Sequence, residues 1–569
     1  MPVQGDDVYY LAQAEHAQIE PLHPSNVRYV FMGDEVDLRG HPHPPFNAWF
    51  LGLLLATFKD FYGGRFHFAY ILFSFIATAS VWSLARRFSP HPVWATLLFC
   101  VTPAFVINGT SFETDVPHMA LFVASVALFV RAIDERSRRL LFLSTIPMVC
   151  AALTALQAAA LVPILWLYLW LHDRRNKLAY AVALTPIVTI AAFQIFERAT
   201  TGTVPAAILT GYLSSYGFQQ LQNKLLNAAA LTVHLGWIVF PVLWILYLRA
   251  RRSAKEPFLE GWLAIYFLAA VALFFAGSAR YLLPIAAPAA ILVSRQSRLL
   301  PVAFFSYLVL SLALGVCNFW HWESYRRFAL DLRSKMPERT WVNSEWGLRF
   351  YLEDGGALPA RRSQALHPGE MMVTSKLGYP VPITTGGGRL TPYASLTVHP
   401  ILPLQIIGMH AHSGYSTASK GLLPFDITWA PIDEVEASVI SKVDPKLSQL
   451  PMNAPEAPEQ LVSGFFDLEE KRWRWMSGQG VALLKEPPQP AKVFAEFYIP
   501  DVAPGRRVQI LLDKKKVAER TYDAPGQYVL ESAQPVTGST LSLEIDQTFS
   551  PPGDNRQLGM IVTALGFRE

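Results

Sequence analysis

The stretch FHFAYILFSFIATASVWSLAR, residues 66–86, is apolar until it ends in arginine. A helix needs about 20 apolar residues to cross a bilayer, so this stretch is long enough to span one. Further apolar segments lie at about 93–110, 116–133, 139–154, 157–172, 178–197, 227–249, 258–277, 281–294 and 299–319. The pattern predicts a polytopic α-helical membrane domain over residues 1–320, with ten crossings.

The composition agrees with a membrane protein. Of the 569 residues, 52% are hydrophobic and 16% are charged, whereas soluble domains carry about 25% charged residues. The three cysteines, Cys100, Cys150 and Cys317, fall inside apolar segments, which argues against a disulfide framework or a cysteine zinc site. The net charge is only +4, and we expect no nucleic-acid partner.

The loops between the apolar segments alternate in charge. One side carries the basic residues: Arg86 with Arg87, the run 131–139, Arg174 with Arg175 and Lys177, the run from Arg249 to Lys255, and Arg295 with Arg298. The excess of positive charge predicts that this side is cytoplasmic. The other side then holds residues 1–65, 108–115, 198–226, 278–280 and everything after 320. We therefore expect a multi-pass protein of the cytoplasmic (inner) membrane whose C-terminal part is extracytoplasmic.

Two features of the N-terminus follow from this orientation. The segment 44–62 is apolar, but a crossing there would break the alternation, so we expect an interfacial helix in the outer loop 1–65. A chain that begins outside also needs a segment that carries it across. We expect a first spanning helix upstream of Gly5, about 20 residues long.

After residue 320 the sequence becomes soluble in character. Residues 321–458 predict an extracytoplasmic mixed α/β region that ends in a proline-rich linker. Residues 459–569 contain short alternating runs separated by turn residues, which predict a β-sandwich.

Two acidic motifs fall on the predicted outer side. Asp6 and Asp7 precede a predicted helix, and Glu113 and Asp115 lie just before a spanning segment. Each aspartate could act only as a helix cap. Acidic groups near lipid are costly and usually face a cavity, which favours one shared site.

Cation-capable side chains occur on the same side. Arg39, His41 and His43 form one cluster, and Arg280 with Tyr281 stands at a second outer corner. Arginine and protonated histidine suit a phosphate clamp. A collar for anionic lipid heads, or a snorkelling anchor at Arg280, is the structural alternative.

The order of these motifs resembles the GT-C glycosyltransferases. The matching residues are Gly5-Asp6-Asp7-x-x-Tyr10, His43-Pro-Pro, Glu113-x-Asp115 and Arg280-Tyr281-Leu-Leu-Pro284. The branch resembled most contains bacterial relatives of protein O-mannosyltransferases and the lipid A aminoarabinose transferase. The resemblance covers about residues 1–320 and is strongest over the first 135.

The resemblance implies roles for individual residues. An acidic residue of the first outer loop is the family's catalytic base, which corresponds to Asp6 or Asp7, with Asp6 at the first position of the pair. The family's cation before Pro-Pro, often lysine, contacts the lipid phosphate. Here it is His43, so the clamp is expected to depend on pH or on Arg39 and His41. Glu113, Asp115, Arg280 and Tyr281 are the further substrate-binding candidates.

The resulting expectation is an inverting transferase that moves a sugar from a polyprenyl-phosphate donor in the membrane to a lipid, glycan or protein acceptor at the outer face. No cofactor is required by the sequence, and a divalent metal held by the acidic residues is an option that no ligand spacing demands. Two alternatives remain at this point. One is a transporter or flippase of lipid-linked sugars, and the other is a non-catalytic anchor for a carbohydrate-binding-like C-terminal module.

Overall fold

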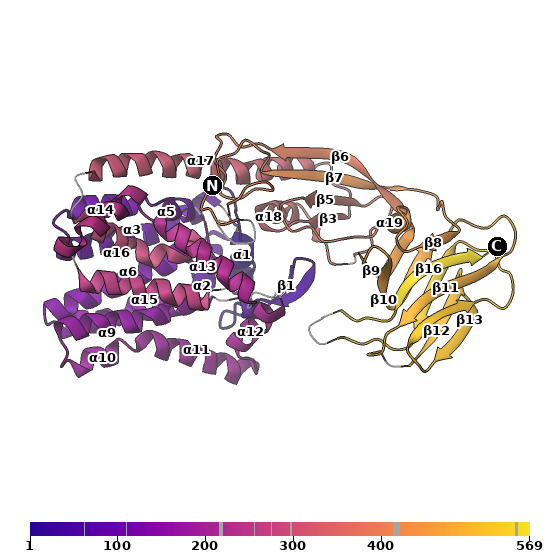
Figure 1. Ribbon diagram of the computed structural model, residues 1–569, viewed down its shortest axis with the longest axis horizontal. Helices are drawn as coiled ribbons and strands as arrows, with labels where there is room; N and C mark the ends of the chain where they lie inside the picture. Colours follow the sequence, from indigo (N-terminus) through magenta and orange to yellow (C-terminus); the bar gives the residue numbers. More distant parts are fainter. Residues whose placement is uncertain are drawn as a thin grey trace.

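The computed structural model describes residues 1–569 except 42, 62, 110, 216–219, 255, 275, 296–298, 363, 414–420, 504, 552–555 and 569. Lys255 and Arg298, two of the basic residues counted above, lie outside the described residues. The chain forms a helical region, a mixed sheet and a C-terminal antiparallel sheet, in that order (Figure 1). The predicted fold class is thereby confirmed.

Every predicted apolar segment is mainly helical in the structure. The helices are α3 Gly63–Phe88, α4 Pro92–Cys100, α5 Pro103–Asn108, α6 Asp115–Asp134, α7 Arg138–Leu143, α8 Thr145–Thr154, η2 Leu156–Ala160, α9 Leu161–His172, α10 Lys177–Val182, α11 Thr185–Thr201, α13 Leu221–Gly236, α14 Pro241–Ala254, α15 Pro257–Leu273, η3 Ala279–Leu282, α16 Leu283–Ser294 and α17 Leu300–Arg333.

Several of these segments are broken in two. Proline starts the second helix of two broken pairs, at Pro103 and Pro241, because its ring fixes φ and removes a backbone donor. By length and composition, four continuous stretches among the described residues can cross a membrane: Gly63–Phe88, Asp115–Asp134, Lys177–Thr201 and Leu300–Arg333. A fifth results if α13 and the described part of α14, bent by 81°, count as one span. The protein is a multi-pass membrane protein, and the count of ten crossings stays a prediction.

Helix α6 lies at the centre of the helical region. In its most apolar window 89% of the residues are buried, compared with 33% for α3. Asp115 is its first residue, so this acidic group lies at the start of the most buried of the four continuous spans.

The segment before α3 contains α1 Asp7–His16, β1 Arg28–Phe31, β2 Asp34–Asp37, η1 Leu38–Gly40 and α2 Phe46–Phe58. Helix α2 has 13 residues. At 1.5 Å per residue it is too short to span a membrane, and this length agrees with the predicted interfacial helix. Helix α12 Pro205–Ser215 packs against η1.

The α/β region after the helical region forms a five-stranded mixed sheet with strand order β4-β3-β5-β7-β6. Its elements are β3 Thr340–Asn343, α18 Trp346–Asp354, β4 Leu358–Pro359, β5 Met371–Ser375, β6 Gly388–Val398 and β7 Asp433–Lys442. Strand β3 is parallel to β4 and β5, whereas β7 is antiparallel to β5 and β6.

The C-terminal strands belong to one hydrogen-bonded antiparallel sheet that closes nearly on itself. They are β8 Gln449–Pro451, β9 Leu461–Glu469, β10 Trp473–Leu483, β11 Lys492–Ile499, β12 Arg506–Leu512, β13 Lys515–Tyr522, β14 Gly526–Glu531, β15 Thr540–Ile545 and β16 Ile561–Arg568, with the short helix α19 Ala457–Gln460 before β9. The order is β13-β12-β15-β10-β16-β11-β14, and the end strands β13 and β14 contact each other. The sheet is therefore nearly closed, a form that shares its alternating sequence pattern with a sandwich.

The N-terminal elements lie between the helical region and the mixed sheet. In Figure 1, α1, β1 and α12 lie at the end of the helical region that faces α18 and β3. Helix α1 contacts both α2 and α18. The N-terminal acidic motif and the soluble region thus share one end of the helical region.

Candidate active site

The start of α1 meets the loop that precedes α6. The backbone N–H of Asp6 donates to Glu113 Oε1 at 3.2 Å, and the N–H of Phe112 donates to Asp7 Oδ1 at 2.6 Å. Gly5 has φ +45°, and a Cβ at this position would lie 2.8 Å from Glu113 Oε1. The glycine of the motif therefore permits the close approach of the two acidic segments.

The two aspartates of the motif have different surroundings. Asp7 is fully buried and accepts hydrogen bonds from the backbone N–H groups of Gln4 and Phe112. Burial raises the pKa of the Asp7 carboxyl well above its ordinary value. The Asp6 side chain keeps 30% of its surface exposed. Asp6 occupies the N-cap position of α1 but makes no capping hydrogen bond with its side chain, so it is the accessible carboxylate of the pair.

Arg280 joins the two acidic motifs. Its Nη2 lies 3.0 Å from Asp6 Oδ2, its Nη1 bonds Glu113 Oε2, and Nη1 lies 3.8 Å from Asp115 Oδ2. The guanidinium is 7% exposed and lies over the Tyr281 ring, 5.2 Å from the centroid. Three carboxylates thus share one buried cation, and the structure brings together five of the predicted site residues.

One recess opens beside this cluster, and we call it the Arg280 recess. It encloses about 250 Å³ of empty space. Its lining residues are His43, Thr114, Asp115, His118, Ala155, Gln157, Tyr266, Arg280, Tyr281 and Pro284. Guanidinium, hydroxyl and amide groups therefore surround one space, and such groups suit an anionic oxygen.

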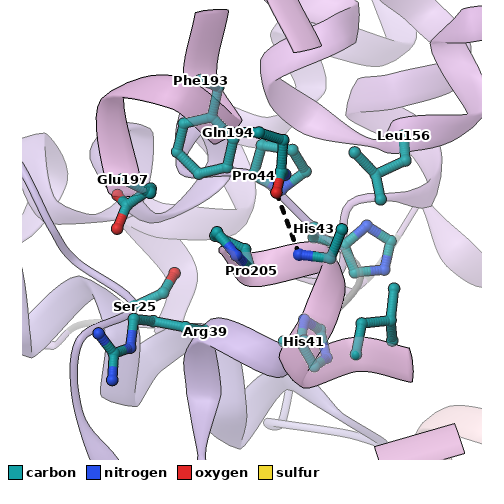
Figure 2. Close-up of a pocket in the computed structure, with 12 residues that line it drawn as sticks. Ser25, Arg39, His41, His43, Pro44, Leu156, Phe193, Gln194, Glu197 and Pro205 are labelled. Atoms are coloured by element: carbon teal, nitrogen blue, oxygen red, sulfur yellow. Dashed lines mark hydrogen bonds between the residues drawn. The ribbon is translucent and has the colours of Figure 1, made fainter. Parts of the chain in front are cut away.

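A second recess, which we call the Arg39 recess, has about 360 Å³ of empty space that is partly open to solvent. It is lined by Ser25, Arg39, His41, His43, Pro44, Leu156, Phe193, Gln194, Glu197, Pro205, Ala206 and Leu209 (Figure 2). His43 lines both recesses. The predicted cluster of cations is therefore divided, with Arg39 and His41 in one recess and Arg280 in the other.

Arg39 is already paired within its own segment. Its Nε donates to Asp37 Oδ1 at 3.0 Å, and its Nη2 donates to Asp37 Oδ2 at 2.6 Å. This two-point contact neutralises the cation locally and fixes its plane.

The surroundings of the two histidines disfavour their charged forms. Their rings lie 5.0 Å apart, and His43 Nδ1 is 3.0 Å from the Thr114 hydroxyl, which also contacts the Tyr10 hydroxyl at 3.2 Å. Burial lowers the pKa of His41 to about 4 and the pKa of His43 well below its ordinary value. The enclosed site therefore disfavours a charged ring at His43, and the expectation that His43 acts as a pH-dependent cation stays a prediction.

The soluble region helps to position α1. Glu345, just before α18, accepts hydrogen bonds from the Tyr9 hydroxyl at 2.9 Å and from the Met32 N–H at 2.7 Å. Arg349 bonds both Glu345 and the Val30 carbonyl. Trp346 adopts φ +66° although it is a buried aromatic residue. A large side chain in this region is strained, and the surrounding contacts must hold it there.

Several site residues were not singled out from the sequence. Thr114 lies inside the acidic motif itself, and Glu197 lies at the end of the predicted segment 178–197, where an acidic residue near lipid is the signal that could have identified it. Within the described ranges, no group of three His, Cys, Asp or Glu side chains is placed to hold a metal ion. The option of a divalent metal stays a prediction.

Comparison with known proteins gives one family match. Residues 42–197 match the family described as dolichyl-phosphate-mannose-protein mannosyltransferase. No curated protein matches the chain.

Several solved structures are similar to this chain in fold. ArnT from Cupriavidus metallidurans bound to undecaprenyl phosphate has a TM-score of 0.43 and 13% identity, over 66% of this chain and 89% of that one. The Archaeoglobus fulgidus oligosaccharyltransferase tethered with an acceptor peptide has a TM-score of 0.41 and 9% identity, over 100% and 94%. Arabinosyltransferase EmbB from Mycobacterium smegmatis has a TM-score of 0.33 and 10% identity, over 100% and 62%. None of the residue roles assigned to this chain depends on these similarities.

Proposed function

We propose that this chain transfers a sugar from a polyprenyl-phosphate donor to an acceptor at the outer face of the cytoplasmic membrane. The match of residues 42–197 to the family described as dolichyl-phosphate-mannose-protein mannosyltransferase supports this proposal. The observation that carries the proposal is the position of Asp6. Its partly exposed carboxylate lies 3.0 Å from the buried Arg280 guanidinium, so a base and a cation stand side by side.

In the proposed reaction, Asp6 takes the proton from the acceptor hydroxyl. The hydroxyl oxygen attacks the anomeric carbon from the face opposite the phosphate, which inverts the configuration. The bond between the anomeric carbon and the phosphate oxygen breaks, and the polyprenyl phosphate leaves with its electron pair. Negative charge grows on that oxygen, and Arg280 stabilises it in an enclosed site.

The other groups of the Arg280 recess orient the donor. The hydroxyl groups of Thr114 and Tyr281 and the imidazole of His43 can donate hydrogen bonds to phosphate oxygens. Asp115 lines the same space and can accept hydrogen bonds from the sugar hydroxyls. Glu113 is bound to Arg280 and to the Asp6 N–H, so its role is to hold these two groups in place.

The test of the function is the loss of a sugar from the cell envelope. A strain without the gene should lack one sugar on a lipid, glycan or protein, which mass spectrometry of the envelope fractions would identify. Accumulation of the sugar-loaded polyprenyl phosphate in the same strain is also expected. An envelope unchanged in sugar content would contradict the proposal.

The His43 substitution provides a test of charge. Replacing His43 by Gln is expected to lower turnover by the same factor at about pH 6.5 and at about pH 8.5, because an imidazole with a lowered pKa is neutral throughout this range. The measurement is the ratio of wild-type to variant turnover at each pH. A ratio that falls toward one as pH rises through about 6.5 would instead indicate a protonated His43.

The orientation is proposed from the basic loops. A reporter protein fused after residue 330 should be active outside the cytoplasm, because the arginine-rich loops belong to the other side. A reporter fused after Arg175 should be active inside. The opposite pair of results would place the site on the cytoplasmic face.

A further inference from the structure

The Arg39 recess contains polar groups that the reaction above does not use. Glu197, at the outer end of α11, is 4% exposed. Its Oε1 lies 3.0 Å from His23 Nδ1, whereas its Oε2 is buried without a hydrogen-bond partner among the described residues. His41 Nδ1 is also buried and without a partner in that part of the chain. Both residues line the recess, as Figure 2 shows.

A buried carboxylate oxygen needs a hydrogen-bond donor, since leaving it unpaired costs free energy. We propose that the donor is a hydroxyl group of the acceptor, and that the Arg39 recess is the acceptor subsite for an uncharged, polyhydroxylated head group. This inference rests on the proposed glycosyl transfer and specifies which substrate enters which recess.

The charges of the recess favour a hydroxylated ligand over a phosphate. Asp37 neutralises Arg39 with a two-point contact, and burial keeps His41 neutral by lowering its pKa to about 4. Glu197 then contributes a carboxylate that repels an anion but accepts hydrogen bonds from hydroxyl groups. The Arg280 recess differs, because a guanidinium lines it beside the Asp115 carboxylate.

The shape of the recess also suits a sugar. Its 360 Å³ of empty space is within the range of small-ligand sites, about 300–1,000 Å³. Phe193 and Pro205 give it an apolar wall, and Gln194 Oε1 accepts the Ala206 N–H at 3.0 Å, which ties α11 to the start of α12. Figure 2 shows Phe193, Gln194 and Pro205 grouped beside His43.

The position of the recess connects it to the chemistry. His43 lines both recesses, so a ligand in one is adjacent to a ligand in the other. The Tyr10 ring lies 5.2 Å from the His41 ring and 5.8 Å from the His43 ring, measured between centroids. Asp6 is the N-cap of the helix that carries Tyr10, so the base lies near the Arg39 recess. An acceptor held by Glu197 can therefore present a hydroxyl toward Asp6 while the donor occupies the Arg280 recess.

The test distinguishes an effect on acceptor binding from an effect on donor binding. The purified full-length variant Glu197→Gln is supplied with membranes of the deletion strain as the source of acceptor. The amount of membrane is varied, and mass spectrometry measures how much of the lost sugar is incorporated. The apparent KM for acceptor membranes should rise about 10-fold or more, because a charged hydrogen bond becomes a neutral one. Turnover at saturating acceptor should change little, and retention of added polyprenyl phosphate should equal that of the wild type.

Two controls distinguish binding from structure. Glu256→Gln makes the same change on a residue that is paired with Arg295, and it should leave the acceptor KM unchanged. His23→Ala removes the partner of Glu197 Oε1 and should give no comparable rise in KM. A rise as large for His23→Ala, or a fall in saturated turnover with an unchanged KM for Glu197→Gln, would overturn the inference. If the wild-type protein incorporates no sugar, the proposed function itself is wrong, whatever the variants show.

Discussion

Replacing Asp6 by Asn is expected to lower turnover by about 100- to 10,000-fold, the usual effect of losing a general base. Asn keeps the size of the side chain but cannot take a proton. Retention of polyprenyl phosphate should stay near the wild-type value, because the base acts only as the acceptor is deprotonated. Sugar transfer and lipid retention, measured separately on the purified protein, check this result.

Asp7→Asn provides the matched control. Asn has one acceptor oxygen, whereas Asp7 accepts hydrogen bonds from two backbone N–H groups, those of Gln4 and Phe112. One buried N–H is then left unpaired, and the free energy of unfolding should fall by about 1–3 kcal/mol. Turnover per folded molecule should fall much less than for Asp6→Asn. If Asp6→Asn instead keeps full turnover, Asp6 is not the base.

The second large effect is expected at Arg280. Replacing it by Ala removes a cation that contacts Asp6, Glu113 and Asp115 together. Breaking a buried ion pair from one side usually destabilises a protein by about 3–5 kcal/mol. We expect thermal unfolding in detergent at a clearly lower temperature, together with loss of turnover and of polyprenyl-phosphate retention.

A double substitution separates the two roles of Arg280. Arg280→Met combined with Glu113→Gln removes both the cation and its closest carboxylate partner. This pair should recover part of the lost thermal stability, because Glu113 no longer leaves a buried charge without its cation, whereas Asp6 and Asp115 still lose their contact with Arg280. Turnover should remain low, since the leaving phosphate still lacks its counter-charge. Recovery of both stability and turnover would show that Arg280 has only a structural role.

The sequence predicted the elements that depend on local patterns. Long apolar segments must be helical in lipid, because every backbone polar group needs a partner there, and these segments are helical in the structure. The spacing of the acidic motifs on one predicted side was enough to place Asp6, Glu113 and Arg280 in one site. In these cases the predicted membrane topology indicated which residues lie on the same side of the membrane, without knowledge of any tertiary contact.

Other features depend on contacts between distant residues. The neutral state of His43 follows from its enclosure, and the pairing of Arg39 follows from the turn that places Asp37 beside it. The alternation of the C-terminal strands is common to sandwiches and to nearly closed sheets, so only the strand order distinguishes them. Glu197 lies far from the other site residues in sequence, and only the packing of α11 brings it to the recess.

The contacts of Glu345 and Arg349 with Tyr9, Met32 and Val30 have a consequence for building hybrid enzymes. A chimera that joins the membrane helices of this protein to the soluble part of a relative would separate Glu345 from the segment that it holds. The N-terminal loop and α18 therefore form one structural unit. A functional exchange must move residues 1–40 together with α18, even though more than 300 residues separate them in the chain.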